Sequence, residues 1–97
     1  MAIGVTAKLV IQSGQNQAFE EVFARLAEAV NKHEDGCEFY KIYRHSEEPD
    51  TYVVLESYVD QAALEAHRET EHFRSIGIEL GPLLAAPPEL SIMQSCS

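Results

Sequence analysis

Residues 52–73 carry several side chains that can move protons. Glu56 and Tyr58 fall near the end of a strand-like run, and His67 and His72 follow in a helix-like run, in a chain with four histidines. Imidazole titrates near neutral pH, so general acid–base chemistry is its natural use. If these side chains border a cavity, we expect proton transfer there, with His67, His72 and Tyr58 as the catalytic candidates.

Four further side chains are candidates for contact with a substrate. Tyr40 offers a hydroxyl donor on an apolar body. Glu56 lies among apolar strand residues, where a carboxylate needs a partner or a shifted pKa, and we expect an ion pair or a backbone anchor more than general-base work. Phe23 and Phe73 are expected to form an apolar wall. Core packing is the alternative for the tyrosines and phenylalanines.

The histidines also have alternatives to catalysis. His67 could be partly buried and bonded to the backbone, and His72 could bond the backbone around a helix start or a second subunit. A metal site from His67, His72 and Glu56 is not expected, because two histidines five residues apart do not match a zinc-binding pattern. We expect no metal and no cofactor.

Periodicity and turn residues predict the elements that must position these side chains. Apolar residues at three- and four-residue steps predict a helix over 16–33, begun by Ser13 or Asn16 and ended by Gly36 with a positive φ. Asp60 and Thr70 are expected to cap two further helical stretches, and Pro82 to end or kink the second. The expected strands are 3–11, 37–45, 51–58 and 89–95, and the second helix is 61–69.

This β-α-β-β-α-β order predicts an α+β, ferredoxin-like fold, with helices on one face of an antiparallel four-stranded sheet. Leu9 to Ile11 and Val53 to Leu55 are consecutive apolar residues, whereas a sheet with one wet face should alternate. A second subunit covering the other face would explain them, so we expect a homodimer. Strong β-propensity without a dimer is the alternative.

The amino-acid composition limits the classes of partner that the protein is expected to bind. The chain has 97 residues, which we interpret as a single domain over 1–97. Its 16 acidic and 7 basic side chains give a net charge of -9, which argues against nucleic acid and against an anionic membrane surface. No apolar run is long enough to span a membrane, and the first residues lack a signal-peptide pattern, so we expect a cytoplasmic protein.

The order and spacing of several short motifs resemble the antibiotic biosynthesis monooxygenase superfamily, whose members form dimeric α+β barrels. The resemblance covers nearly the whole chain. The motifs are Gly14 after the first strand, Asp35-Gly36-Cys37 with Tyr40, Glu56-x-Tyr58, and Ala63-Leu64-x-x-His67-x-x-Thr70-x-His72-Phe73.

The resemblance implies a cofactor-independent monooxygenase acting on a small aromatic or quinol ligand. The haem-degrading branch is disfavoured, because its Asn, Trp and His are replaced by Ala7, His67 and Gly77 and the chain has no tryptophan. The segments around Tyr58 and Pro82 are similar to a branch that isomerises a phosphorylated hydroxy-ketone signal. An isomerase and a ligand-binding module without catalysis therefore remain alternatives.

Overall fold

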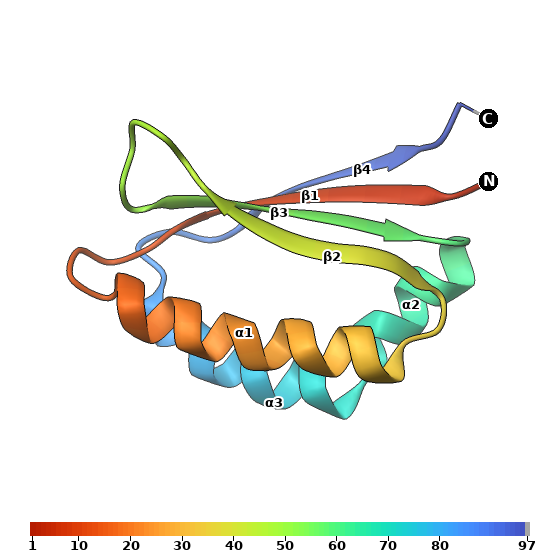
Figure 1. The fold of residues 1–97 in the computed structure, drawn as a ribbon, viewed down its shortest axis with the longest axis horizontal. Helices are drawn as coiled ribbons and strands as arrows, with labels where there is room; N and C mark the ends of the chain where they lie inside the picture. Colours follow the sequence, from red (N-terminus) through yellow and green to blue (C-terminus); the bar gives the residue numbers. More distant parts are fainter. Residues whose placement is uncertain (97) are drawn as a thin grey trace.

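A four-stranded antiparallel sheet, with helices packed against one face, forms the fold (Figure 1). A computed structural model describes residues 1–96. The strand order β2-β3-β1-β4 confirms the predicted ferredoxin-like topology. In chain order the elements are β1 (Ile3–Val10), α1 (Asn16–His33), β2 (Cys37–Arg44), β3 (Thr51–Tyr58), α2 (Gln61–Glu69), α3 (Glu71–Leu80), the 3₁₀ turn η1 (Gly81–Leu83) and β4 (Glu89–Gln94).

The core lies between the sheet and the helices, as the apolar periodicity requires. In β1 every second side chain from Ile3 to Leu9 is buried, which is the period of a strand with one covered face. In α1 the buried residues recur at three- and four-residue steps, so one stripe of the helix faces the sheet. These are Phe19, Phe23, Leu26 and Val30.

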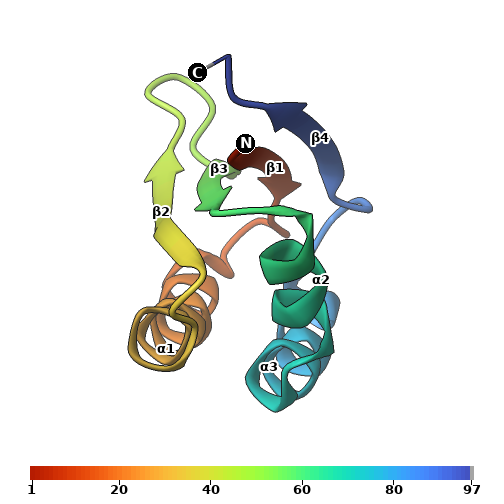
Figure 2. The ribbon, with the colours of Figure 1, turned by 90° about the vertical axis from the view of Figure 1, so that its right-hand side faces the viewer.

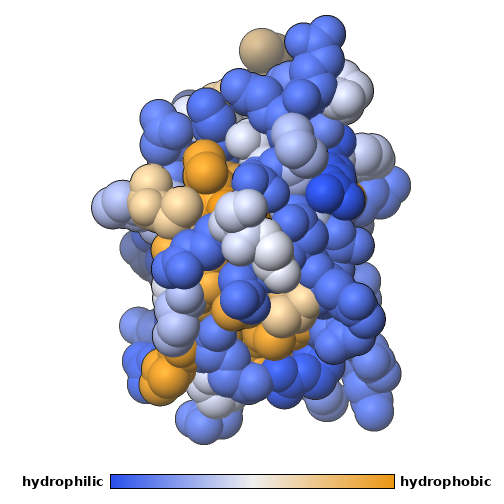
Figure 3. Space-filling model, turned by 90° about the vertical axis from the view of Figure 1, so that its left-hand side faces the viewer, coloured by the Kyte–Doolittle hydropathy of each residue, from blue (hydrophilic) through white to orange (hydrophobic). Residues whose placement is uncertain are grey.

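The helices form two columns beneath the sheet. Figure 2 shows α1 below the β2 side and the α2–α3 pair below the β1 and β4 side. The end that carries the β1–α1 connection and the β2–β3 hairpin has a mostly hydrophilic surface broken by apolar patches (Figure 3). None of the helices in residues 1–96 is long and apolar enough to cross a membrane.

Within residues 1–96, no helix covers the other face of the sheet (Figure 1). Val53 and Leu55 of β3 lie on it and are half-buried, while Tyr43 of β2 and Met93 of β4 are exposed. All of β4 is exposed. This face of the sheet therefore carries apolar side chains, as the consecutive apolar residues in the sequence suggested.

Two of the expected helix caps are confirmed. The Asp60 carboxylate accepts the amide hydrogen of Ala63 at 2.9 Å and begins α2. The Thr70 hydroxyl accepts the amide hydrogen of Phe73 at 3.2 Å and begins α3. These bonds satisfy amide donors that a helix start leaves free, and they fix where the two histidines fall.

The start of α1 differs from the expectation. Gln15 takes the cap position and makes no side-chain cap bond. Asn16 instead donates to the Pro49 carbonyl at 2.9 Å and to the Tyr52 hydroxyl at 3.1 Å. Its amide thus ties α1 to the β2–β3 connection, a tertiary contact that local sequence does not encode.

The positive φ expected at Gly36 is also wrong. Among residues 1–96, Gly14 is the glycine with positive φ, at 86°. Gly36 is needed for a different reason, because a Cβ placed there would lie 2.6 Å from Cβ of Ala63 in α2. The glycine lets the start of β2 approach α2 closely.

Candidate active site

An apolar cavity of about 230 Å³ lies between the sheet and the α1 and α3 helices. All four side chains considered for substrate contact, Phe23, Tyr40, Glu56 and Phe73, line it. The other lining residues are Ala7, Leu9, Phe19, Leu26, Val54, Gly77, Leu80, Gly81, Leu84, Pro88 and Leu90. Glu56 is thus the one carboxylate in this lining.

Glu56 is buried, with 8% of its surface exposed. The expected ion pair is not formed among the described residues; instead one carboxylate oxygen accepts the Tyr58 hydroxyl at 2.6 Å. Burial raises the pKa of Glu56, while the bond from Tyr58 and the charge of Arg68 oppose the shift. A carboxylate with a raised pKa is a stronger base than one in water, which suits proton abstraction.

Tyr40 supplies a donor beside that carboxylate. It pairs directly with Glu56 across β2 and β3, so both side chains leave the same face of the sheet. Its ring stacks on Phe23 with centroids 5.6 Å apart. The hydroxyl has no hydrogen-bond partner within residues 1–96, although Tyr40 is only 6% exposed. Burial, followed by the charges of Glu56 and Glu34, raises the pKa of Tyr40, so the phenol stays protonated.

His67 lies behind the cavity wall. It is 2% exposed and is not among the cavity-lining residues. Its ring packs against three others, with centroids 5.4 Å from Tyr40, 5.3 Å from Tyr58 and 4.7 Å from Phe73. His67 therefore touches two residues of the cavity wall and the tyrosine that holds Glu56.

Glu34 holds both histidines. Its carboxylate oxygens lie 2.8 and 3.0 Å from Nδ1 of His67, and one of them also contacts Nε2 of His72. The alternatives in which these nitrogens of His67 and His72 bond the backbone are therefore wrong. Burial lowers the pKa of His67, and the neighbouring Glu34 opposes that shift. We call Glu34, His67 and His72 the bridged histidine pair.

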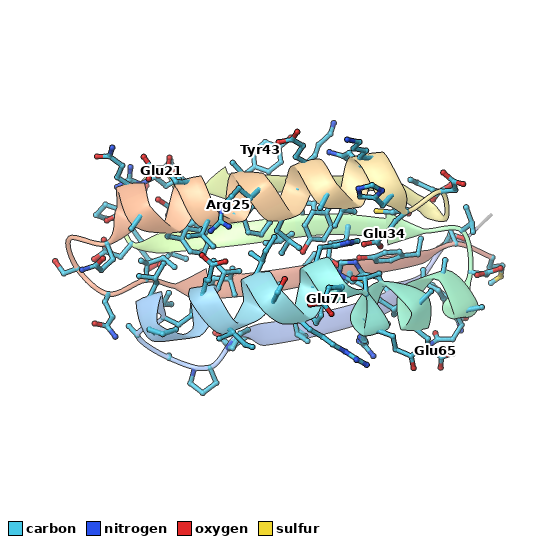
Figure 4. The ribbon with its side chains drawn as sticks, turned by 90° about the horizontal axis from the view of Figure 1, so that it is seen from below. Glu21, Arg25, Glu34, Tyr43, Glu65 and Glu71 are labelled. Atoms are coloured by element: carbon cyan, nitrogen blue, oxygen red, sulfur yellow. The ribbon has the colours of Figure 1, made fainter. Side chains whose placement is uncertain are left out.

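Glu34 escaped the sequence interpretation, although one signal was present. It is the C-terminal cap of α1, where the helix dipole disfavours negative charge. An acidic side chain at such a position indicates a partner elsewhere. Which partner it takes depends on how α1 packs against α2 and α3, as Figure 4 shows with Glu34 between the helices and Glu65 pointing away.

A second, more polar hollow of about 220 Å³ lies beside the bridged histidine pair. His67 lines this hollow and separates it from the wall of the apolar cavity, whereas Tyr58 and His72 line neither hollow. The catalytic candidates thus do not converge on one cavity. The lining of the polar hollow is His33, Glu34, Asp35, Gly36, Cys37, Ala63, Ala66, His67 and Thr70.

The described part of the chain holds no cluster of metal ligands, and the pKa of its Cys37 is not lowered. Within residues 1–96, no group of three or more His, Cys, Asp or Glu side chains is placed to hold a metal ion. Cys37 and Cys96 are both free thiols. Burial, together with the charge of Glu34, raises the pKa of Cys37 to about 11, so it remains a thiol at neutral pH and is a poor nucleophile.

A family model described as "Antibiotic biosynthesis monooxygenase" matches residues 2–76. The chain belongs to this family. A curated relative in Bacillus subtilis (strain 168), YcnE, which is provisionally named a monooxygenase, is 34% identical over 70 residues, covering 69% of this chain and 74% of the relative.

Solved structures agree with this family and fold. A protein of Caulobacter crescentus CB15, provisionally named an antibiotic biosynthesis monooxygenase, is 35% identical with a TM-score of 0.96, over 99% of this chain and 91% of that one. A conserved protein of Methanosarcina mazei Go1 is 30% identical with a TM-score of 0.91, over 97% and 92% of the two chains. The resemblance inferred from the motifs is confirmed.

Proposed function

We propose that the protein is a monooxygenase that oxidises a small neutral hydroxylated aromatic, such as a quinol or an anthrone, with O2 and without a cofactor. The observation that carries the proposal is Glu56, a buried carboxylate in a mostly apolar cavity. It lies directly across the strands from Tyr40, whose hydroxyl has no hydrogen-bond partner among the described residues. Membership of the monooxygenase family, and the name of the Bacillus subtilis relative, support the reaction class.

The cavity favours a neutral ring as the substrate. An apolar cavity of about 150 Å³ can hold benzene, so about 230 Å³ suits one or two substituted rings. The described lining contains no Lys or Arg, and the chain carries a net charge of -9. A phosphorylated substrate would find no counter-charge there, which disfavours the isomerase alternative.

In the proposed reaction Glu56 takes the proton of the substrate hydroxyl or of an acidic C–H. We give it the base role first expected for His67, because Glu56 lines the cavity and His67 does not. The Tyr40 hydroxyl then donates to the oxyanion that forms. A positioned base typically contributes about 10²–10⁴ in rate.

The substrate supplies the electrons for the oxygen step. Its anion passes one electron to O2, and the resulting radical pair joins at a ring carbon to form a peroxide. Glu56 returns its proton to the peroxide, which loses water by breaking the O–O bond and the C–H bond on the same carbon. One oxygen atom stays on that carbon as a carbonyl, and the other leaves as water.

An oxygen electrode and ¹⁸O2 test the proposal on a panel of quinols and anthrones. We expect one O2 consumed per substrate, with one labelled atom in the product. The methyl ether of a reactive phenol should bind without being oxidised, because it has no proton for Glu56. Solvent deuterium entering the substrate without O2 uptake, or tight binding without turnover, would overturn the proposal in favour of an isomerase or a binding module.

We also propose that a second copy covers the open face of the sheet. The half-buried Val53 and Leu55 on that face support this assembly. Light scattering should give twice the monomer mass, and Leu55→Lys should shift the protein towards monomer. The matched change Ile78→Lys, at an exposed residue of α3, should not alter the mass. A monomeric wild-type protein at micromolar concentration would contradict this assembly.

A further inference from the structure

The bridged histidine pair is built around a carboxylate that touches no part of the apolar cavity. The Glu34 side chain is 9% exposed, that of His67 3% and that of His72 17%. A nearly buried carboxylate that accepts from two imidazoles is strongly constrained, because each bond fixes one ring. The bridged histidine pair contacts the cavity wall through the His67 ring, which packs on Tyr40 and Phe73.

The orientation of His67 affects every polar group of the cavity. Its ring packs on Tyr40, whose hydroxyl has no hydrogen-bond partner within residues 1–96, and on Tyr58, whose hydroxyl donates to Glu56. It also packs on Phe73, which closes the cavity wall. A rotation of this imidazole would therefore disturb the donor, the base and the wall together.

The Glu34 carboxylate fixes the tautomer of the His67 ring as well as its orientation. When neutral, His67 carries one ring proton, and the acceptor at Nδ1 places that proton on Nδ1. Nε2 then keeps its lone pair. The ionisable groups that act on this ring are Glu34 after α1, His72 on α3 and Arg68 on α2.

We propose that Glu34 is a positioning residue, which holds His67 as the Nδ1–H tautomer in one orientation and thereby sets Tyr40, Tyr58 and Phe73 around the substrate. Glu34 acts through His67 and does not touch the substrate. The inference rests on the proposed function, since it assigns Glu34 a part in the same reaction. In such sites a misplacement of about 1 Å can lower the rate about 100-fold.

Nitrogen-15 NMR of the imidazoles tests the proposal without any turnover. In the wild-type protein we expect the shifts of His67 to show a protonated Nδ1 and an unprotonated Nε2. Glu34→Gln keeps an acceptor oxygen and should keep this tautomer, whereas Glu34→Ala should give a tautomer mixture. An Nε2–H tautomer in the wild-type protein would overturn the proposal.

Kinetics supply the second readout. We expect kcat/KM to fall about 100-fold in Glu34→Ala and less than about fivefold in Glu34→Gln, a rescue that a merely charged surface residue would not show. Glu65→Ala, on the exposed side of α2, is the matched control and should match the wild-type protein. Equal kcat/KM in Glu34→Ala and Glu65→Ala would also overturn the proposal.

The failure of this inference can be told apart from the failure of the proposed function. If the wild-type protein consumes no O2 with any substrate of the panel, the proposed function fails, but the tautomer and the affinity for an aromatic ligand can still be measured anaerobically. Affinity should then fall about tenfold in Glu34→Ala and stay near wild type in Glu34→Gln. If Glu34→Ala does not fold, the wild-type tautomer and the Gln variant decide the question.

Discussion

Two carboxylates lie under the same sheet in different surroundings. Glu56 has an apolar cavity around it and one hydroxyl donor, from Tyr58. Glu34 has two imidazoles on its oxygens and a polar hollow beside it. The comparison shows how hydrogen-bond partners give two identical functional groups different roles. Glu56 is left able to take a proton, whereas Glu34 holds other side chains in place.

The largest expected effect is on the reaction itself. Glu56→Gln keeps the shape of the side chain and removes its basicity, so kcat/KM should fall by about 10²–10⁴. Oxygen uptake with a quinol substrate measures it. The Glu65→Gln variant, at an exposed glutamate, is the control. A Glu56→Gln enzyme with near wild-type rates would remove the base role that separates this carboxylate from Glu34.

The free energy of unfolding should rank the two carboxylates in the opposite order. Glu34→Ala leaves the Nδ1–H donor of His67 without its acceptor, which should lower the free energy of unfolding by about 1–3 kcal/mol. In Glu56→Gln the Tyr58 hydroxyl can still donate to the amide oxygen, so the loss should stay below about 1 kcal/mol. Urea unfolding at pH 7 measures both, and a larger loss in Glu56→Gln would reverse the comparison.

A smaller effect should appear in the pH dependence of the rate. The Tyr58 hydroxyl stabilises the charged form of Glu56 and so opposes the rise of its pKa. Tyr58→Phe removes this bond, and the acidic limb of the kcat/KM profile should move to higher pH. Tyr43→Phe, at an exposed tyrosine of β2, should leave the profile unchanged. A limb that stays in place would show that Glu56 does not control it.

The smallest effects concern stability against pH, and they should have opposite signs. The folded pKa of Glu56 is raised, so its contribution is present below the ordinary value of 4.5 and is lost as pH rises through the folded pKa. The folded pKa of His67 is lowered, so its contribution is present above 6.5 and is lost as pH falls through the folded pKa.

Urea unfolding between pH 4 and pH 8, as an approximate working range, separates these two contributions. Glu56→Gln should abolish the loss of stability on the way up in pH, and His67→Gln should abolish the loss on the way down. Both variants keep a polar side chain of similar size. If either substitution removed the opposite slope, the direction assigned to that pKa would be wrong.

The sequence predicted the fold well because helix periodicity and helix caps depend on residues that are close together in the chain. The apolar periodicity of α1, and the caps Asp60 and Thr70, involve residues within a few positions of one another. The expected end of β1 at Ile11 was one residue too long, since Ile11 forms an isolated bridge with Leu84 beyond the strand. That bridge depends on a partner far along the chain.

The candidate site was predicted less completely. Residue type and strand position led to Tyr40 and Glu56, which pair across β2 and β3. The placement of His67 behind the wall depends on Glu34, which lies 33 residues earlier in the chain. No spacing rule links an acid at a helix end to a histidine three elements later, so this contact required the packed structure.

The close approach at Gly36 has a consequence for how this protein can vary. A single methyl group at that position would meet Cβ of Ala63 and push α2 away from the start of β2. Because α2 carries His67, that displacement would reach the bridged histidine pair and the rings around Glu56 together. A substitution of Gly36 by alanine would therefore displace the surroundings of both Glu34 and Glu56, although position 36 contributes no functional group to either site.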